Sequence, residues 1–284
     1  MIDEKLKKDI DNIVWWIPFK KTRNSLRKVI INYFECYYYI NNDIQNIYKN
    51  TNIINELYRD NNYLCPICGY SGKEFLPFGV VKRKNAQCPN CKSLERHRLY
   101  YLYLLRKINA DKKLKVCHFA PEKSIKDTFD LFKNIDYISC DIVPNRAMCV
   151  QDITSTTFED NYFDIVFCSH VLEHIPDDIK AMKELRRILK PDGFAILQVP
   201  YFYNWKGEEL KTTYEDFSIT SPEEREKAFG QNDHVRVYTK EDYVNRLNKS
   251  GFNVYEDNFY YTLSDKAIKK YSLIEEVIFY CTKN

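Results

Sequence analysis

The sequence lacks any apolar run approaching the roughly 18 uncharged residues that a membrane-spanning helix needs. Its first residues, MIDEKLKKDIDNIVWW, carry acids and have no small-residue cleavage site after an apolar core. We therefore expect no transmembrane segment and no secretory signal, and we predict a cytoplasmic location. In such a reducing compartment the single cysteines are expected to act as small buried hydrophobes. These are Cys36, Cys117, Cys140, Cys149, Cys168 and Cys281.

Glycine is absent before Gly69, and proline is absent between Pro18 and Pro66. These absences allow a long helix, and apolar positions from Leu26 to Tyr58 alternate by four and three residues over about 50 Å of helix. Such a stripe fits a coiled coil, which would form a homodimer or a hairpin, or an amphipathic helix packed on its own core. The preceding WWIPFKKTRNSLRK fits buried tryptophans or a peripheral membrane contact.

Two Cys-x-x-Cys pairs stand in the segment 61–107, in CPICG and CPNCK. Cys65, Cys68, Cys88 and Cys91 can place four thiolates tetrahedrally around one Zn²⁺, with no position open for chemistry. We therefore predict a structural zinc module, followed by a helix on which His97 is exposed. The segment holds nine basic residues and two acids, so it can meet an anionic partner.

From residue 108 onward, strand and helix patterns alternate. The patterns predict strands at 114–119, 135–140, 147–151, 163–168, 194–199, 252–260 and 276–282, and helices at 122–133, 177–190 and 240–250. This alternation indicates an α/β fold with a mostly parallel, doubly wound sheet and a ligand at the carboxyl ends of its strands. The last two strands have a short connection and are expected to form an antiparallel edge.

Several of the predicted strands end in polar residues that suit a nucleoside ligand. The first strand ends in HFAPE, which contains His118, Ala120 and Glu122; the second ends at Asp141, and Asp152 follows the third. A carboxylate at the end of the second strand can accept hydrogen bonds from two ribose hydroxyls. The turn after the first strand contains no glycine, because Ala120 and Pro121 occupy it, so its backbone is expected to pass the ligand by a path that alanine and proline can adopt. Glu122 can accept a hydrogen bond from an ammonium group, or favour the positive end of the following helix.

The segment NYFDIVFCSHVLEHIPDDIKAMKELRRILKPDGFAILQVP resembles class I S-adenosylmethionine-dependent methyltransferases of the UbiE or small-molecule type. Together with the zinc module, HFAPE and DHVRVY, it is similar to a bacterial subgroup often found near surface-glycan genes. The resemblance implies a Rossmann-like seven-stranded domain that binds S-adenosylmethionine. It places Asp141 at the ribose, Asp152 and Ile153 at the adenine, and Ser169 and His170 near the methyl group.

A competing motif is present, because His170, Glu173 and His174 have the H-x-x-E-H spacing of inverted zinc peptidases. Pro176 follows at once, which excludes the long helix that such a site needs, and the sequence shows no third ligand. The motif therefore does not indicate a protease.

We predict three parts: a helical segment 1–60, the zinc module and its helix at 61–107, and a methyltransferase domain at 108–284 with a lid insertion at 201–238. The insertion is rich in aromatic residues that can stack on a sugar or base, and His234 and Arg236 can touch the acceptor there. The expected reaction methylates a polar small-molecule or glycan acceptor, with His170 or His234 as general base. RNA base methylation through the basic module and a non-catalytic scaffold are the alternatives.

Overall fold

The computed structural model describes residues 62–109 and 111–283, together with positions 8, 10, 11, 24, 26 and 27. The chain divides into two compact units, Met1–Asn62 with Ser71–Lys73 and Tyr63–Tyr70 with Glu74–Asn284. The predicted coiled-coil helix, its role in a dimer and the membrane contact fall outside the described residues, apart from those isolated positions. The second unit carries the sheet and the candidate site.

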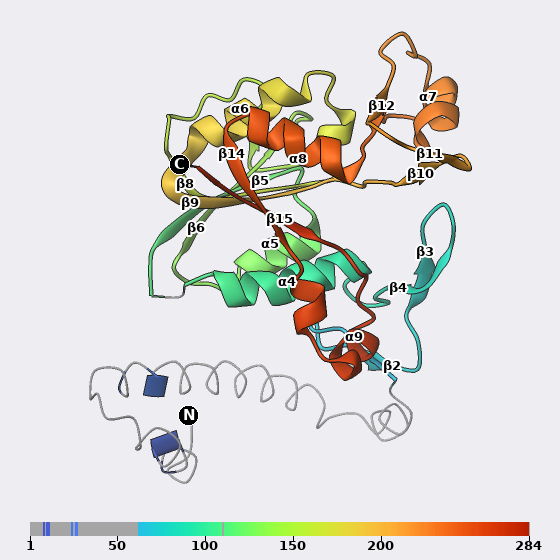
Figure 1. The fold of residues 1–284 in the computed structure, drawn as a ribbon. Helices are drawn as coiled ribbons and strands as arrows, with labels where there is room; N and C mark the ends of the chain where they lie inside the picture. Colours follow the sequence, from blue (N-terminus) through green and yellow to red (C-terminus); the bar gives the residue numbers. More distant parts are fainter. Residues whose placement is uncertain are drawn as a thin grey trace. The chain divides into compact units, whose positions relative to one another are not determined.

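Seven strands of the second unit form one sheet in the order β14-β15-β9-β8-β5-β6-β7 (Figure 1). The strand β15 alone runs in the direction opposite to the other six strands. The strands β6 and β7 lie on one side of β5, and β8 and β9, which follow them in the sequence, lie on the other side. The predicted Rossmann-like, seven-stranded methyltransferase fold is therefore confirmed, as is the antiparallel pairing of the last two strands. The strands are β5 (Leu114–Phe119), β6 (Ile135–Asp141), β7 (Cys149–Val150), β8 (Phe163–Ser169), β9 (Leu189–Gln198), β14 (Phe252–Asp257) and β15 (Ile278–Lys283).

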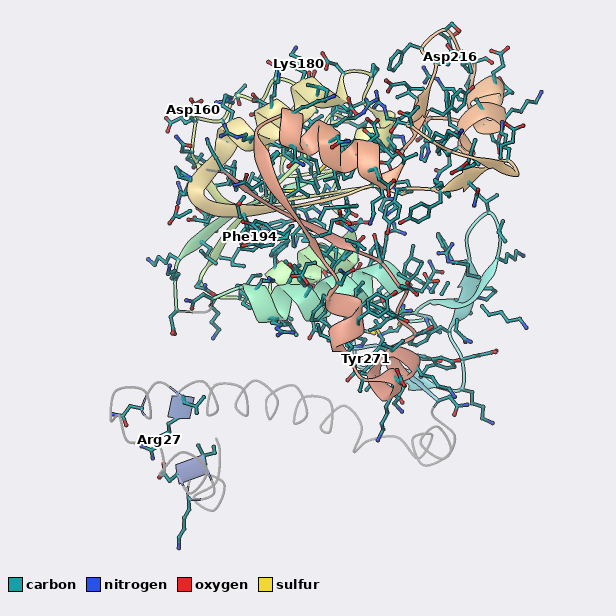
Figure 2. All side chains as sticks on the ribbon, viewed as in Figure 1. Arg27, Asp160, Lys180, Phe194, Asp216 and Tyr271 are labelled. Atoms are coloured by element: carbon teal, nitrogen blue, oxygen red, sulfur yellow. The ribbon has the colours of Figure 1, made fainter. Side chains whose placement is uncertain are left out.

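Helices cover both faces of the sheet. On one face lie α6 (Asp178–Ile188) and α8 (Lys240–Lys249), and on the other α4 (Glu95–Lys107) and α5 (Lys123–Phe129) (Figure 1). Each face has its own apolar cluster, and side chains fill the space between the layers (Figure 2). The helix α6 begins where the Asp177 side chain accepts a hydrogen bond from the Lys180 backbone N–H at 2.9 Å. Its buried residues recur at helical spacing: Ala181, Met182, Leu185 and Ile188.

The cysteine-containing segment is made of short strands: β1 (Tyr63–Leu64), β2 (Ser71–Gly72), β3 (Leu76–Phe78) and β4 (Arg83–Gln87). The strands β3 and β4 form an antiparallel hairpin. The buried Arg98 of α4 joins this segment to the rest of the unit, because its guanidinium donates to the carbonyl oxygens of Ala86 (3.1 Å) and Ser272 (2.7 Å). Ser272 follows α9 (Asp265–Tyr271), a helix that the sequence patterns did not predict.

The insertion after β9 folds into short elements that lie beside the end of the sheet, where Asp216 is labelled in Figure 2. Arg236 was predicted to touch the acceptor, but its side chain is fully buried and donates to the Leu172 and Pro176 carbonyls (2.9 and 2.8 Å) and to Glu215 (2.9 Å). Arg236 therefore ties the insertion to the segment after β8. The elements are β10 (Asn204–Trp205), β11 (Glu208–Glu209), β12 (Tyr214–Glu215), α7 (Pro222–Phe229) and β13 (Arg236–Val237).

Among the described helices, none is long and apolar enough to cross a lipid bilayer. The prediction that single cysteines are buried is confirmed for four of them, and Cys149 is half-buried. Cys36 falls outside the described residues. The buried four are Cys117, Cys140, Cys168 and Cys281.

Candidate functional site at the carboxyl ends of β5 and β8

The order of the strands reverses between β5 and β8, and in open α/β sheets ligands bind outside the carboxyl ends of the strands at such a point. The turn after β5 contains no glycine, yet Ala120 has φ of +47°, a left-handed conformation that glycine adopts more easily. The Ala120 N–H donates to the Cys140 carbonyl at 2.8 Å and so keeps the turn against the end of β6. The backbone of this turn thus takes a conformation typical of glycine, although the residue is alanine.

Glu122 follows this turn and faces the first turn of α4. Its Oε1 lies 2.8 Å from His97 Nε2 and 3.3 Å from an Arg96 guanidinium nitrogen. Burial by itself raises the pKa of Glu122, but the hydrogen bond from His97 and the charge of Arg96 outweigh burial and bring the pKa to about 2. Glu122 is therefore ionised at neutral pH, and its side chain makes no capping hydrogen bond to α5.

His97 was predicted to be an exposed helix residue, and that prediction is wrong because only 7% of its surface is exposed. Its Nδ1 accepts a hydrogen bond from the Leu94 backbone N–H at 3.1 Å. The proton of the neutral ring must then be on Nε2, which donates to Glu122. Burial lowers the pKa of His97, and the neighbouring Glu122 carboxylate opposes this effect.

His118 lies within β5 and is fully buried on the face covered by α4 and α5. Its ring packs edge-on against Phe129 and Phe167, and its Nδ1 lies 3.0 Å from the Tyr137 hydroxyl. Burial lowers the pKa of His118 to about 4. The ring is thus part of the core under the site, with its Nε2 left without a hydrogen-bond partner.

Ser169 ends β8, and His170 follows it with φ of +56°. The His170 N–H donates to the Gln198 carbonyl at 2.8 Å, which keeps this turn at the end of β9. Glu173 stands on the single 3₁₀ turn η1 (Leu172–His174), so the prediction that no long helix forms here is confirmed. The His170 Nδ1 lies 3.4 Å from Glu173 Oε1, and Glu173 is 1% exposed.

Asp141 and Asp152 lie at the same edge of the sheet. Asp141 ends β6, and its carbonyl accepts a hydrogen bond from the Gln151 N–H at 3.0 Å, one residue before Asp152. Both carboxylates accept hydrogen bonds at 2.8 Å from the backbone two residues later, and neither is buried. Ile153 is 5% exposed and packs in the apolar cluster under α6.

Polar atoms without partners gather at these strand ends. Among the described residues outside the N-terminal segment, every buried side-chain nitrogen or oxygen that lacks a hydrogen bond belongs to this site. Such groups are rare in folded proteins and call for an explanation such as a ligand. They belong to Arg96, His118, Glu122, Ser169, His170 and Glu173, and in Glu173 both carboxylate oxygens lack a partner.

His234 comes from the insertion and lies against His174, with ring centroids 4.7 Å apart and the rings nearly perpendicular. His234 is 6% exposed, and burial lowers its pKa. The charge of Glu173 raises the pKa of His234, but by less than burial lowers it. The structure thus brings His234 to the segment that contains His170, and which of the two acts as a base stays a prediction.

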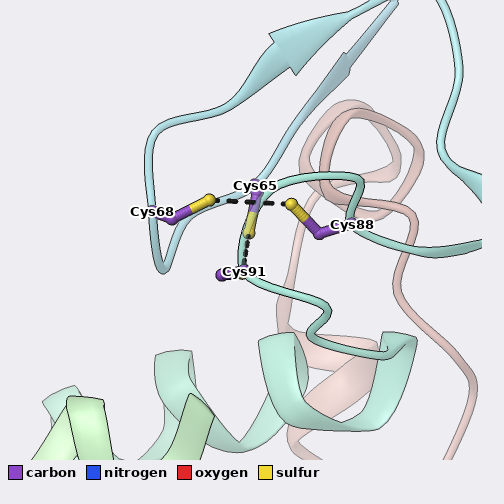
Figure 3. A group of neighbouring side chains, drawn as sticks. All are labelled: Cys65, Cys68, Cys88 and Cys91. Carbon is purple, nitrogen blue, oxygen red and sulfur yellow. Dashed lines mark hydrogen bonds between the residues drawn. The ribbon is translucent and has the colours of Figure 1, made fainter. Parts of the chain in front are cut away.

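The four predicted zinc ligands also come together (Figure 3). The sulfur atoms of Cys65 and Cys91 are 3.6 Å apart, as are those of Cys68 and Cys88. Thiolates at 2.3 Å from a tetrahedral Zn²⁺ would be about 3.8 Å apart, so the cluster has the dimensions of a Cys₄ zinc site. Ser93 Oγ lies 3.1 Å from the Cys91 sulfur and can support it.

The chain is similar to known proteins over the part that contains the sheet and its site. Residues 127–197 match the family model of the methyltransferase domain. This range runs from α5 through β9 and includes Asp141, Asp152, Ser169 and His170. The prediction of a methyltransferase domain is therefore confirmed for this part of the chain.

Individual relatives match parts of the chain. The chain is 36% identical over 100 residues to protein MJ0638 of Methanocaldococcus jannaschii, covering 32% of this chain and 42% of that protein. It is 26% identical over 136 residues to demethylmenaquinone methyltransferase of Staphylococcus aureus, covering 42% of this chain and 56% of that enzyme. Among solved structures, the PH0226 protein of Pyrococcus horikoshii matches with a TM-score of 0.43 and 20% identity, over 69% of this chain and 94% of that one. The chain thus spans about half the length of these curated relatives.

Sequence reasoning missed part of the site. Arg96 and His97 were assigned to a linking helix, but they contact Glu122 across 25 or more residues of sequence. Glu276 was read as part of a strand, whereas it accepts hydrogen bonds from the Tyr100 hydroxyl (2.7 Å) and Gln198 (3.0 Å) beneath the site. Burial raises the pKa of Glu276, and the charges of His170 and Arg96 oppose that rise. A carboxylate within the apolar run LIEEVIFY was the only signal of such a role.

Proposed function

We propose that this chain is an S-adenosylmethionine-dependent methyltransferase that acts on a polar acceptor. One observation carries the proposal: buried polar atoms without partners converge at the switch point of a Rossmann-like sheet. The match of residues 127–197 to the methyltransferase domain supports it. A sulfonium cofactor with an ammonium group, a ribose and an adenine presents the donors and acceptors that such a set of groups can bind.

The residues at the strand ends fit the cofactor in order along the sheet. The Glu122 carboxylate, which has one buried oxygen free, would accept from the ammonium group beside the turn at Ala120. Asp141 would accept from the ribose hydroxyls, and Asp152 and Ile153 would border the adenine. Ser169 would face the methionine part. The cofactor supplies an activated methyl group, and the chain positions it in line with the acceptor.

Of the two predicted bases, we assign the role to His170. The Nε2 atom of His170 is buried without a hydrogen-bond partner. His170 itself directly follows Ser169, the last residue of β8. His234 instead packs its ring on His174. A general base contributes about 10²- to 10⁴-fold, so His170→Gln is expected to lower kcat by that factor. His170→Gln turning over at the wild-type rate would remove the assignment.

For the acceptor we propose a saccharide or glycan precursor. The insertion exposes four aromatic rings, and such rings can stack on the faces of sugars. Arg236 holds the insertion at the segment after β8, so these rings belong to the same end of the sheet as His170. The four rings are Phe202, Tyr203, Tyr214 and Phe217.

RNA base methylation is the second candidate. The hairpin of β3 and β4 exposes Lys82 and Lys84 beside Val80 and Val81, which are 89% and 83% exposed. A basic hairpin can track a phosphate backbone, in which case affinity for a structured RNA falls steeply with salt. Fluorescence anisotropy with such an RNA at rising salt tests this alternative, and an affinity that salt does not change would exclude it.

We further propose that the four cysteines hold a structural Zn²⁺ that stabilises residues 63–94. That segment has only a small apolar cluster, around Phe75, so the metal would supply much of its stability. The division into three parts, the cytoplasmic location and the dimer through the N-terminal helix stay predictions.

Isothermal titration with S-adenosylmethionine tests the central proposal. Wild-type protein should bind, and Glu122→Gln and Asp141→Asn should each bind at least ~10-fold more weakly, because each loses a charged acceptor. The matched control is Asp136→Asn, which changes an exposed carboxylate at the opposite end of β6 and should bind like the wild type. Absence of any binding heat would contradict the proposal and favour a non-catalytic scaffold.

A further inference from the structure

A second group of potential metal ligands lies beside the candidate site, at Glu173, His174 and His234. One ligand atom from each of these side chains lies within 4.8 Å of the others. Glu173 and His174 belong to η1, whereas His234 comes from the insertion 60 residues later. This group differs from the H-x-x-E-H motif, because it leaves out His170 and takes its third ligand, His234, from a distant segment.

The Glu173 carboxylate is the strongest indication of a ligand. It is 1% exposed, and neither of its oxygens has a hydrogen-bond partner. Among the described residues, the one ion-pairing nitrogen within 4 Å of it is His170 Nδ1, at 3.4 Å. Removing a carboxylate from water without compensation is costly, so an unpaired one at this depth requires a positive partner.

A hydrogen bond holds the His174 ring in a suitable orientation. His174 Nδ1 lies 3.2 Å from the Asp233 carbonyl, which can only accept, so Nδ1 carries the proton and Nε2 has a free lone pair. Metal-binding histidines usually donate their other ring N–H to a carbonyl or carboxylate in this way.

The two ligand segments are also locked to each other. The Val235 N–H, next to His234, donates to the Glu173 carbonyl at 3.0 Å. Arg236 donates to the Leu172 and Pro176 carbonyls on both sides of Glu173 and His174. Such a frame preorganises the ligands before any ion arrives.

We propose that Glu173, His174 and His234 bind a divalent transition-metal ion, at a site separate from the four cysteines. Two imidazoles and one carboxylate suit Zn²⁺, Fe²⁺, Mn²⁺ or Co²⁺ better than the oxygen-preferring Mg²⁺ or Ca²⁺. Ligand atoms about 2.1 Å from such an ion stand about 3.4 Å apart, so small side-chain rotations close the set. Three protein ligands leave at least one coordination position open.

The role of the ion rests on the proposed function. An ion held by these residues would sit at the end of the sheet that holds His170, where the acceptor of a methyl group would be. An ion there would bind an oxygen of a hydroxyl acceptor and orient it toward the methyl group. Metal binding itself needs neither the cofactor nor the acceptor, so it is measured without them.

Cobalt titration of the full chain tests the site. Protein purified with Zn²⁺ and briefly treated with a weak chelator is titrated with Co²⁺ while its absorption is followed. Wild-type protein should bind one equivalent of Co²⁺ with d–d absorption and without thiolate-to-cobalt charge transfer, which separates this ion from the cysteine site. Binding should be at least ~100-fold weaker in Glu173→Gln and His234→Gln.

The matched control is His97→Gln, a change of another buried histidine at the same end of the sheet. Glutamine at this helix position can still accept from the Leu94 N–H, so the variant should fold and bind Co²⁺ like the wild type. Co²⁺ should raise the Tm of the wild type and of His97→Gln but leave that of Glu173→Gln unchanged, which a merely structural role of Glu173 would not produce. Absence of the non-thiolate equivalent in the wild type, or equal binding by Glu173→Gln and His234→Gln, would overturn the proposal. Neither result depends on whether the chain binds S-adenosylmethionine.

Discussion

The buried His118 makes a quantitative prediction about stability and pH. Its ring is fully buried among Phe129, Phe167 and Tyr137, and burial lowers its pKa from 6.5 to about 4. Between these two pH values the unfolded chain binds a proton that the folded chain does not. The free energy of unfolding must therefore fall as the pH drops from 6.5 to about 4.

The size of the effect follows from the gap between the two pKa values. Each pKa unit corresponds to about 1.4 kcal/mol, so His118 alone should cost the folded state about 3 kcal/mol between pH 6.5 and pH 4. Above pH 6.5 the His118 ring is mostly neutral in both the folded and the unfolded chain, so it no longer changes the free energy of unfolding with pH. This loss is comparable to a large share of the 5–15 kcal/mol that stabilises typical domains, so it is readily measured.

Urea unfolding of three proteins at several pH values between 4.5 and 7 isolates this term. His118→Gln cannot titrate, so the difference in unfolding free energy between it and the wild type should change by about 2.5 kcal/mol across this range. Tyr137→Phe loses the hydroxyl 3.0 Å from the ring but keeps the imidazole, so its pH profile should parallel that of the wild type. Loss of Zn²⁺ from thiolates at low pH affects all three proteins alike and cancels in the differences. If the difference between wild type and His118→Gln stays constant with pH, the assigned protonation is wrong.

Three further outcomes are expected. Ala120→Gly should raise the free energy of unfolding by about 1 kcal/mol and Ala120→Val should lower it, because φ of +47° strains residues with a Cβ; equal urea midpoints for both would contradict this. Arg236→Lys should lower Tm by the equivalent of about 3 kcal/mol, since one ammonium cannot replace the guanidinium bonds to Glu215 and three carbonyls; an unchanged Tm would show that the clamp is not needed. Cys88→Ser should lose the zinc equivalent by mass spectrometry of the native protein and open residues 63–94 to protease, while full zinc retention would reject the four-thiolate site.

Local patterns predicted the elements well because they depend on near neighbours. Six strands of the large sheet begin and end within a few residues of the expected positions, and β9 differs by starting directly after α6 at Leu189. The four cysteines were recognisable because their spacing alone limits the geometry of a metal site. The helices α7 and α9 were missed, since both are short and lie in polar segments without a clear apolar period.

Side-chain partners at the site were harder to predict. His97 was expected on an exposed face, because nothing in its local pattern shows that Glu122 will face it. Arg236 was expected at the acceptor, but four polar groups from other segments surround it and make it a structural clamp.

The sequence by itself determined the alternation of strands and helices, the turn without glycine at Ala120 and the paired cysteines, because periodicity and spacing act over a few residues. Only the tertiary structure decided that Glu173 and His174 meet His234, and that Glu122 meets α4. Contacts between segments 25 or 60 residues apart depend on how the layers pack against the sheet. One-dimensional patterns carry no information about which distant side chains that packing brings together.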